Sequence, residues 1–386
     1  MNPEQIQIDE VRSGSDLKRF IKFPWQIYSG NANWVPPLLV DRYEFFDRAK
    51  NPFYRHAEVK LYLARYQGKV LGRIATCVNN AYNEHHQDRV GAFGFFEVID
   101  NYDVAYRLLK TAMITLAGRG MAVMRGPLNF STNHECGLLI DSFDLPPVVM
   151  MTYNPPYYVD FFERFGLKKC KDLLAFQLTK EQLPGERIRN VVERIRQRSG
   201  ATFRKLNMRD FDNEVRRCIE IFNDAWQDNW GYEPLSEAET NHIAKNLKQI
   251  VDPDLVRFAE IDGKTVGFSL ALPDVYQALI KLNGRLLPFG IFKLLWHTKV
   301  RNKIDQVRVV LMGVKAEYRK RGIDNCFYLD TIDIGIGKGY RTGELSWILE
   351  NNDLMISAIE RLGGKRYKTY RIYESPLIGG NLQGNA

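Results

Sequence analysis

A short polar segment carries the residues whose types and spacing could do chemistry. Residues 126–137 read GPLNFSTNHECG. In an extended chain alternate side chains point to one side, so the segment would present groups that orient an amine or hydroxyl and take its proton: Asn129, Ser131, Asn133 and Glu135. The alternative is a turn-rich loop that bonds its own backbone. Glu97, which closes the stretch GFFE, is a second carboxylate candidate or a surface charge at a strand end.

A basic turn nearer the C-terminus has the composition of an anion site. Residues 310–323 read VLMGVKAEYRKRGI, a buried strand that runs into a basic loop, a glycine and a helix start. Free amide groups and the dipole at a helix N-terminus favour an anion, and glycine lets a phosphate approach the backbone. We therefore expect a pyrophosphate here, although a solvated cap is the alternative. The candidate residues are Met312, Gly313, Val314, Arg319, Lys320, Arg321, Gly322 and Ile323.

The elements that must position these residues occur twice. The hairpin LARYQGKVLGRIA (63–75) matches FAEIDGKTVGFSL (258–270), and ERFGLK (163–168) matches ERLGGK (360–365) at nearly the same offset. Two matches in one order indicate an internal repeat. In each copy antiparallel strands come first and strands alternating with helices follow, which predicts an α+β fold: a mixed, mostly antiparallel sheet flanked by helices. We expect an N-terminal domain at 1–180, a basic linker helix at 181–200 and a C-terminal domain at 201–386.

Each copy has one insertion that the other lacks. In the first copy it runs from about 127 to 147, and in the second from 273 to about 296. The second insertion is apolar with a basic end, so it could lie in a membrane interface, line a channel for an acyl chain or form an extra core helix. Its candidate substrate contacts are Phe289 and Phe292.

Composition limits the partners and the compartment. No run of about 20 apolar residues and no targeting segment occurs, so we expect a cytoplasmic protein, with peripheral attachment to the inner face of the membrane as a further expectation. Five scattered cysteines predict neither a metal site nor a disulfide framework. The net charge of +8 favours anionic partners such as a phosphorylated cofactor, an acidic carrier protein, RNA or an anionic membrane, or it only keeps the surface soluble. The basic run 187–198 is expected to be a solvated helix face.

The basic turn resembles the acyl-coenzyme A loop of the GNAT acyltransferase superfamily. That pattern is Arg or Gln, two residues, Gly, one residue, then Gly or Ala, and it is met here by Arg319 and Gly322. Asp324 departs from it in the last place, where a carboxylate would repel a pyrophosphate. At the matching place the first copy has the acidic stretch VIDNYD (98–103) without a glycine. The resemblance thus implies that only the second copy binds acyl-CoA.

The whole chain is similar to tandem GNAT proteins of the bacterial ceramide synthase group. The similar stretches lie mainly in the first copy: WVPP (34–37), HAEV (56–59), GFFE (94–97), 129–141, DLPP (144–147) and PYY (156–158). The resemblance implies an N-acyltransferase that moves a fatty acyl group from acyl-CoA, or from an acyl carrier protein, to the amine of a lipid-like acceptor of the sphingoid-base type.

In this hypothesis Glu135 or Glu97 is the base, and Tyr373 or Tyr370 is the acid for the departing thiolate. The strand at 307–314 would pair with the pantetheine arm, and no metal or nucleic acid takes part. Two alternatives remain open. One is a Fem-like, aminoacyl-tRNA-dependent transferase, in which residues 187–198 would contact RNA. The other is a non-catalytic GNAT-fold module that binds lipid or protein.

Overall fold

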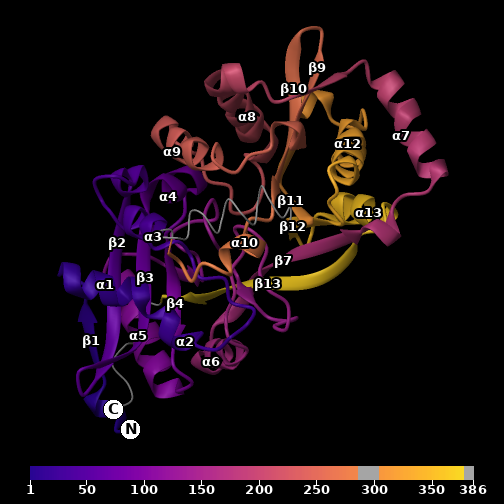
Figure 1. Cartoon of the computed structure of the whole chain (residues 1–386). Helices are drawn as coiled ribbons and strands as arrows, with labels where there is room; N and C mark the ends of the chain where they lie inside the picture. The colour runs from indigo at the N-terminus through magenta and orange to yellow at the C-terminus, as the bar shows by residue number, and fades with distance from the viewer. Residues whose placement is uncertain (286–303, 378–386) are drawn as a thin grey trace. The chain divides into compact units, whose positions relative to one another are not determined.

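The computed structural model describes residues 1–285 and 304–377 (Figure 1). Phe289 and Phe292 therefore lie outside the described residues. Contacts divide the chain into two compact units. Unit 1 comprises Met1–Asp172, Asn283–Arg285 and Thr369–Ala386, and unit 2 comprises Leu173–Leu282 and Leu286–Lys368.

Unit 1 is built on a mixed sheet in which, among its described residues, only one pair of neighbouring strands is parallel. The strand order is β1 (Gln7–Glu10), β2 (Ala57–Tyr66), β3 (Lys69–Asn79), β4 (Val90–Val98), β5 (Val123–Gly126) and β13 (Lys365–Pro376), and β6 (Leu138–Leu139) also pairs with β13. The parallel pair is β4 and β5. It ends at Ala92 and Arg125, after which the two strands stop pairing.

The helices of unit 1 cover this sheet and build its core. They are α1 (Gly14–Lys22), α2 (Pro24–Ile27), α3 (Leu39–Phe45), α4 (Asn80–His86), α5 (Tyr102–Ala117) and α6 (Tyr157–Phe165). Helix α5 buries Leu108, Ala112 and Leu116, which recur every four residues, in the core of the unit. Ser13 caps α1, and α2 starts separately at Pro24, which has no N–H to continue the first helix.

Unit 2 repeats the plan. Its strand order is β7 (Lys168–Thr179), β12 (Thr342–Leu349), β11 (Gln306–Val314), β10 (Lys264–Pro273), β9 (Val256–Ile261) and β8 (Thr202–Lys205). Strands β11 and β12 are parallel, and the other pairs are antiparallel. The described helices are α7 (Glu186–Ser199), α8 (Phe211–Trp226), α9 (Glu237–Leu247), α10 (Tyr276–Leu279), α12 (Ile323–Gly337) and α13 (Asp353–Arg361). The α+β architecture expected from the repeat is confirmed in both units.

Each unit is completed by the last strand of the other sequence copy. In unit 1 the residues Tyr373 to Pro376 of β13 pair with β5. In unit 2 the residues Leu173 to Thr179 of β7 pair with β12. The two units are defined by contacts in the structure. The boundaries 1–180, 181–200 and 201–386 are defined by the repeated sequence, and they stay a prediction.

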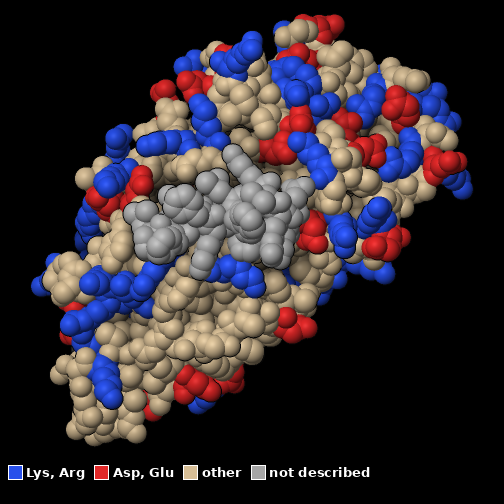
Figure 2. Space-filling view, viewed as in Figure 1, with Lys and Arg blue, Asp and Glu red and all other residues tan. Residues whose placement is uncertain are grey.

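The basic run 187–198 forms helix α7 and packs on α12. Arg189 pairs with Asp333, and Arg196 pairs with Asp330, while Val192 between them is buried. Arg187, Arg194 and Arg198 are exposed, so the expected solvated face is confirmed, while the opposite side packs on α12. The two ion pairs reduce the charge left for RNA. On the face shown in Figure 2, Lys and Arg are interspersed with Asp and Glu.

Candidate active site

Glu97 lies beside a bulge in β4 of unit 1. Arg73 of β3 stands opposite Glu97, but Ala75 stands opposite Gly94, so the two residues Phe95 and Phe96 face one residue of β3. Phe95 has a positive φ of 46°, which is uncommon for a bulky residue and is imposed here by the bulge. The bulge turns the end of β4 and places the Glu97 side chain among aromatic residues.

Two tyrosines donate to one oxygen of Glu97. The hydroxyls of Tyr28 and Tyr158 each lie 2.9 Å from Oε2. Tyr28 follows α2 and Tyr158 lies in α6, so the site draws on three separate elements. The Glu97 side chain is 13% exposed, whereas both tyrosines are buried. The carboxylate is therefore held by donors yet keeps some access to solvent.

Burial sets the electrostatics of this group. It raises the pKa of Glu97 above the usual carboxyl range, although Arg73 and the two tyrosines act in the opposite direction. Arg73 lies 3.6 Å from Oε1 and donates to the Phe20 carbonyl at 2.8 Å. Burial lowers the pKa of Arg73 to about 10. A carboxylate with a raised pKa is a stronger proton acceptor than an exposed one.

Glu135 has a different environment, in a loop closed by its own backbone. Leu128 bridges to Cys136, and the amide of Asn129 donates to the Glu135 carbonyl at 2.8 Å. The Glu135 carboxylate accepts from Arg42 and, at 3.0 Å, from the Asn129 amide group. Burial alone would raise the pKa of Glu135, but Arg42 and Asn129 hold it below its usual value. Glu135 is thus a fixed negative charge rather than a ready base.

Phe95 connects the two carboxylates. Its backbone N–H donates to the side-chain oxygen of Asn129 at 2.7 Å, and Asn129 in turn donates to Glu135. The guanidinium carbons of Arg42 and Arg73 lie 5.9 Å and 5.7 Å from the Phe95 ring centre. The structure therefore brings Asn129, Glu135 and Glu97 into one region of unit 1, arranged around the bulge.

The expected extended presentation of the polar segment was wrong. The segment turns instead, with Phe130 at φ 88°, because the bridge between Leu128 and Cys136 closes it into a loop. Ser131 is buried, lies 2.9 Å from His134 Nδ1 and accepts from the Asn133 backbone N–H. Ser131 and Asn133 thus support the loop, as the turn-rich interpretation predicts, while Asn129 and Glu135 meet across its base.

The loop of unit 1 also fills the gap between β4 and β5. A Cβ on Gly94 would lie 1.9 Å from the Leu128 carbonyl oxygen, so the loop crosses β4 in direct contact. The Leu128 N–H donates to the Phe93 carbonyl at 2.7 Å. In unit 1 the chain itself therefore occupies the space between these parallel strands.

The tyrosines proposed as acids lie in unit 1. The Tyr373 hydroxyl is 3.5 Å from Glu163, and burial raises its pKa to about 12. The Tyr370 hydroxyl contacts the sulfur of Met151 at 3.9 Å. A role for either group in protonating a thiolate stays a prediction.

The basic loop of unit 2 has the geometry of an anion cradle. Lys320 and Gly322 have positive φ values of 65° and 74°, and α12 begins at Ile323. Within the described ranges the backbone N–H groups of Lys320 and Arg321 have no hydrogen-bond partner. Arg319 donates to the carbonyl groups of Val314 and Ala225, so it holds the loop on α8.

Two features require glycine at position 322: its positive φ and the closeness of a neighbouring side chain. A Cβ there would lie 2.5 Å from Ile195 of α7. Asp324, in the first turn of α12, is half-buried and accepts from the Asn325 side chain at 3.3 Å. The strand before the loop ends its parallel pairing at Val309 and Leu345, and a bulge at Val310 follows. Beyond Val309 the strands β11 and β12 no longer pair, which leaves a gap between them. The free amides of the loop and the start of α12 follow β11 directly in the chain.

A buried charged cluster in unit 2 was missed by the sequence analysis. Glu344 of β12 is fully buried, accepts from Ser346 at 3.0 Å and lies 3.4 Å from Nε of Arg308. Burial, opposed by Arg308, raises the pKa of Glu344 to about 7. Asp274 and Lys368 are also buried and act on the same carboxyl. The signal was available, since Glu344 and Arg308 are charged residues inside otherwise apolar strands.

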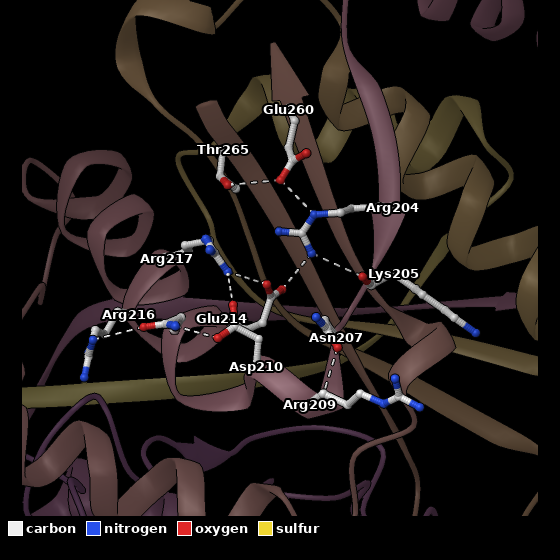
Figure 3. Close-up of polar contacts among 11 residues, drawn as sticks. Arg204, Lys205, Asn207, Arg209, Asp210, Glu214, Arg216, Arg217, Glu260 and Thr265 are labelled. Carbon is white, nitrogen blue, oxygen red and sulfur yellow. Dashed lines mark hydrogen bonds and ion pairs between the residues drawn. The ribbon is translucent and has the colours of Figure 1, made fainter. Parts of the chain in front are cut away.

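A second charged network in unit 2 fixes a helix to a hairpin (Figure 3). Glu214 of α8 is 2% exposed and pairs with Arg204 of β8 at 2.8 Å and with Arg217. Arg204 also pairs with Glu260 of β9 at 2.7 Å. Glu214, Arg204, Arg217 and Glu260 each have a partner of opposite sign, so we interpret these ion pairs as structural.

Curated relatives decide the family. The chain is 39% identical over 378 residues to the bacterial ceramide synthase of Caulobacter vibrioides (strain NA1000 / CB15N), an alignment that covers 96% of this chain and 98% of that protein. It is 36% identical over 368 residues to Protein YghO of Escherichia coli (strain K12), with 94% and 93% covered. The chain belongs to the bacterial ceramide synthase family. No family model matches the sequence.

Solved structures show that this chain has the tandem GNAT fold. A tandem GNAT protein from the clavulanic acid biosynthesis pathway matches with a TM-score of 0.57 at 12% identity, covering 97% of this chain and all of that one. A GCN5-related N-acetyltransferase from Sphaerobacter thermophilus matches at 0.54 and 13% identity, with 98% of both chains covered. Together with the family, the fold identifies the protein as an acyltransferase, which agrees with the resemblance found in the sequence.

Within residues 1–285 and 304–377, no helix is long and apolar enough to cross a membrane. The same residues contain no group of three or more His, Cys, Asp or Glu side chains arranged to hold a metal ion.

Proposed function

We propose that this family member transfers a fatty acyl group from acyl-CoA to the amine of a lipid-like acceptor of the sphingoid-base type. The relative from Caulobacter is named a ceramide synthase, and a ceramide is the amide of a fatty acid and a sphingoid base. The amine nitrogen attacks the thioester carbon, the C–N bond forms and the C–S bond breaks. The nitrogen loses a proton to a base, and the thiolate gains one to leave as free coenzyme A.

The observation that carries this proposal is the environment of Glu97. A long-chain amine is mostly an ammonium ion near neutral pH, so it must lose a proton before it attacks. Glu97 has a raised pKa and two tyrosine hydroxyls in contact, which makes it the proton acceptor of the proposal. Glu135 acts as a positioning residue, because it fixes Arg42 and Asn129 beside the bulge.

The donor is assigned to unit 2. The free amides of Lys320 and Arg321, the positive φ of Gly322 and the start of α12 fit a pyrophosphate, and the strand gap after Val309 fits a pantetheine arm. In unit 1 the corresponding gap is filled by Leu128. We therefore propose one acyl-CoA site per chain, with the protonation of the thiolate left to Tyr373, Tyr370 or water.

The reaction is tested by incubating the purified chain with palmitoyl-CoA and sphinganine, then measuring the amide by mass spectrometry and free thiol by a colour reagent. Equal amounts of amide and thiol are expected. Thiol without amide would indicate a thioesterase and overturn the proposal. Palmitoyl-acyl carrier protein replaces palmitoyl-CoA in a parallel reaction, which shows which thioester is used.

Binding is tested separately by thermal unfolding with acetyl-CoA, palmitoyl-CoA and free coenzyme A. A ligand at 100 times its dissociation constant adds about 2.7 kcal/mol to stability. Palmitoyl-CoA is expected to stabilise most. Peripheral membrane attachment is tested by flotation with anionic and neutral vesicles, and attachment predicts co-flotation with the anionic set.

A further inference from the structure

A pocket lies inside unit 2 between α12 and α13, above β11 and β12. Its cavity volume is about 60 Å³, and it opens to solvent. Val307 and Val309 of β11, Leu345 of β12 and Ile359 of α13 contribute aliphatic walls, and Tyr328 of α12 contributes a ring.

A buried glycine keeps part of this space empty. Gly335 lies in the last turn of α12. It is buried, yet a Cβ built on it would have no atom within 4 Å. Gly343 of β12 also lines the pocket, and its nearest neighbour would be the Leu178 carbonyl oxygen at 4.0 Å. Neither glycine is required by a close neighbour, so the empty space is a property of the site.

The pocket shares its elements with the basic loop before α12, which we call the donor loop because we propose that it binds the acyl donor. Helix α12 starts at that loop and contributes Tyr328 and Gly335 to the pocket. Val309 and Leu345, which line the pocket, are also the last residues of the parallel ladder between β11 and β12. A thioester at the gap beyond this ladder would have its carbonyl end next to the pocket.

We propose that this pocket holds the alkyl chain of the fatty acyl donor, which rests on the proposed use of an acyl-CoA. The acyl chain is favoured over the tail of the acceptor because the donor loop and the pocket lie in one unit, on one helix. Lys180 and Arg341 are exposed at the solvent side of the pocket, and the Lys180 N–H donates to the Arg341 carbonyl at 2.9 Å. A free fatty acid bound by these two cations is the rival occupant.

The test fills the pocket with one side chain. Gly335→Leu should fit, because nothing lies near its Cβ, and should exclude the far end of a long chain. Gly337→Leu is the matched control: it makes the same change in the same helix, also with no atom within 4 Å, but Gly337 is exposed and does not line the pocket. Gly343→Val is a second filling variant on a strand, where valine is favoured.

The measurement is kcat/KM for octanoyl-CoA and palmitoyl-CoA with sphinganine as the acceptor. Loss of two or three methylene contacts should lower the palmitoyl value by about 15- to 60-fold, at about fourfold per methylene, with the octanoyl value unchanged. Gly337→Leu should leave both values unchanged. Equal loss for both donors in Gly335→Leu and Gly343→Val would overturn the proposal, as would a selectivity change that follows the length of the amine.

Calorimetry of palmitoyl-CoA binding separates this proposal from the proposed function. Weaker binding of palmitoyl-CoA, but not of coenzyme A, in Gly335→Leu supports the pocket even if no amide forms. Amide formation with unchanged palmitoyl-CoA binding in both filling variants overturns the pocket and leaves the function intact. The rival occupant predicts that Lys180→Ala and Arg341→Ala weaken binding of palmitate but leave palmitoyl-CoA turnover unchanged. If this is observed and Gly335→Leu does not alter chain selectivity, the occupant is a free fatty acid and the proposal is wrong.

Discussion

The hydroxyl of Tyr158 lies 2.9 Å from Oε2 of Glu97, although 61 positions separate the two residues in the chain. This hydrogen bond favours the ionised carboxylate and so opposes the rise in the pKa of Glu97 that burial causes. The proton affinity of Glu97 is therefore set in part by a residue of α6.

Replacing Tyr158 with Phe is expected to raise the pKa of Glu97 further. Since a base must be ionised to accept a proton, the acid limb of the kcat/KM profile should move to higher pH. Tyr157→Phe is the control, because its hydroxyl donates to the Val98 carbonyl at 2.8 Å and not to Glu97. Superimposable pH profiles for Tyr158→Phe and the parent would show that Glu97 does not control the rate.

The proposal that the basic loop of unit 2 binds the donor is tested at Gly322. Gly322→Val strains a backbone at φ 74° and brings a Cβ within 2.5 Å of Ile195, so coenzyme A affinity should fall about tenfold or more, which is about 1.4 kcal/mol. Gly263→Val has nearly the same φ of 75° without any close neighbour, so it should lose stability alone. Calorimetric titration with coenzyme A distinguishes them, and equal loss in both variants would contradict the assignment.

The buried carboxyl of Glu344 predicts a pH dependence of stability. Its pKa in the folded state is raised from 4.5 to about 7, so the folded protein binds this proton more tightly than the unfolded chain. The contribution of Glu344 is present below pH 4.5 and is lost as the pH rises to about 7, with a slope of up to about 1.4 kcal/mol per pH unit. Urea unfolding of Glu344→Gln across this range should show a smaller slope; the same slope as the parent would disprove the shift.

Breaking the ion pairs of Glu214 (Figure 3) is expected to lower the stability of the protein without changing its selectivity for the acyl donor. Glu214→Ala leaves Arg204 and Arg217 without their buried partner. Because both arginines are partly exposed, the expected loss is about 2–3 kcal/mol, below the 3–5 kcal/mol of a fully buried pair. Glu237→Ala, an exposed residue in the first turn of α9, should stay within about 0.5 kcal/mol. A similar urea midpoint for both variants would refute the structural role.

Local patterns predicted the parts of the site that depend on neighbouring residues. The repeated hairpins and the glycine before α12 are short-range features, so they could be predicted from the sequence. The partners of Glu97 could not, because Tyr28 and Tyr158 are 69 and 61 positions away. The pairing of β7 with β12 and of β13 with β5 could not be predicted either. The sequence of an extended strand does not indicate the strand with which it pairs. Asn129 and Glu135 meet through a closed loop, whereas alternation in an extended chain would have needed a strand there.

The most direct test of the central claim compares two carboxylates in one assay. Single-turnover formation of the amide from palmitoyl-CoA and sphinganine is measured for the parent, Glu97→Gln and Glu135→Gln. Removal of a general base typically lowers the rate by about 100-fold or more, so Glu97→Gln should show this loss with palmitoyl-CoA binding unchanged. Glu135→Gln, which only loosens Arg42 and Asn129, should lose less. A Glu97→Gln variant that forms the amide at the parent rate would contradict the assignment of Glu97 as the proton acceptor.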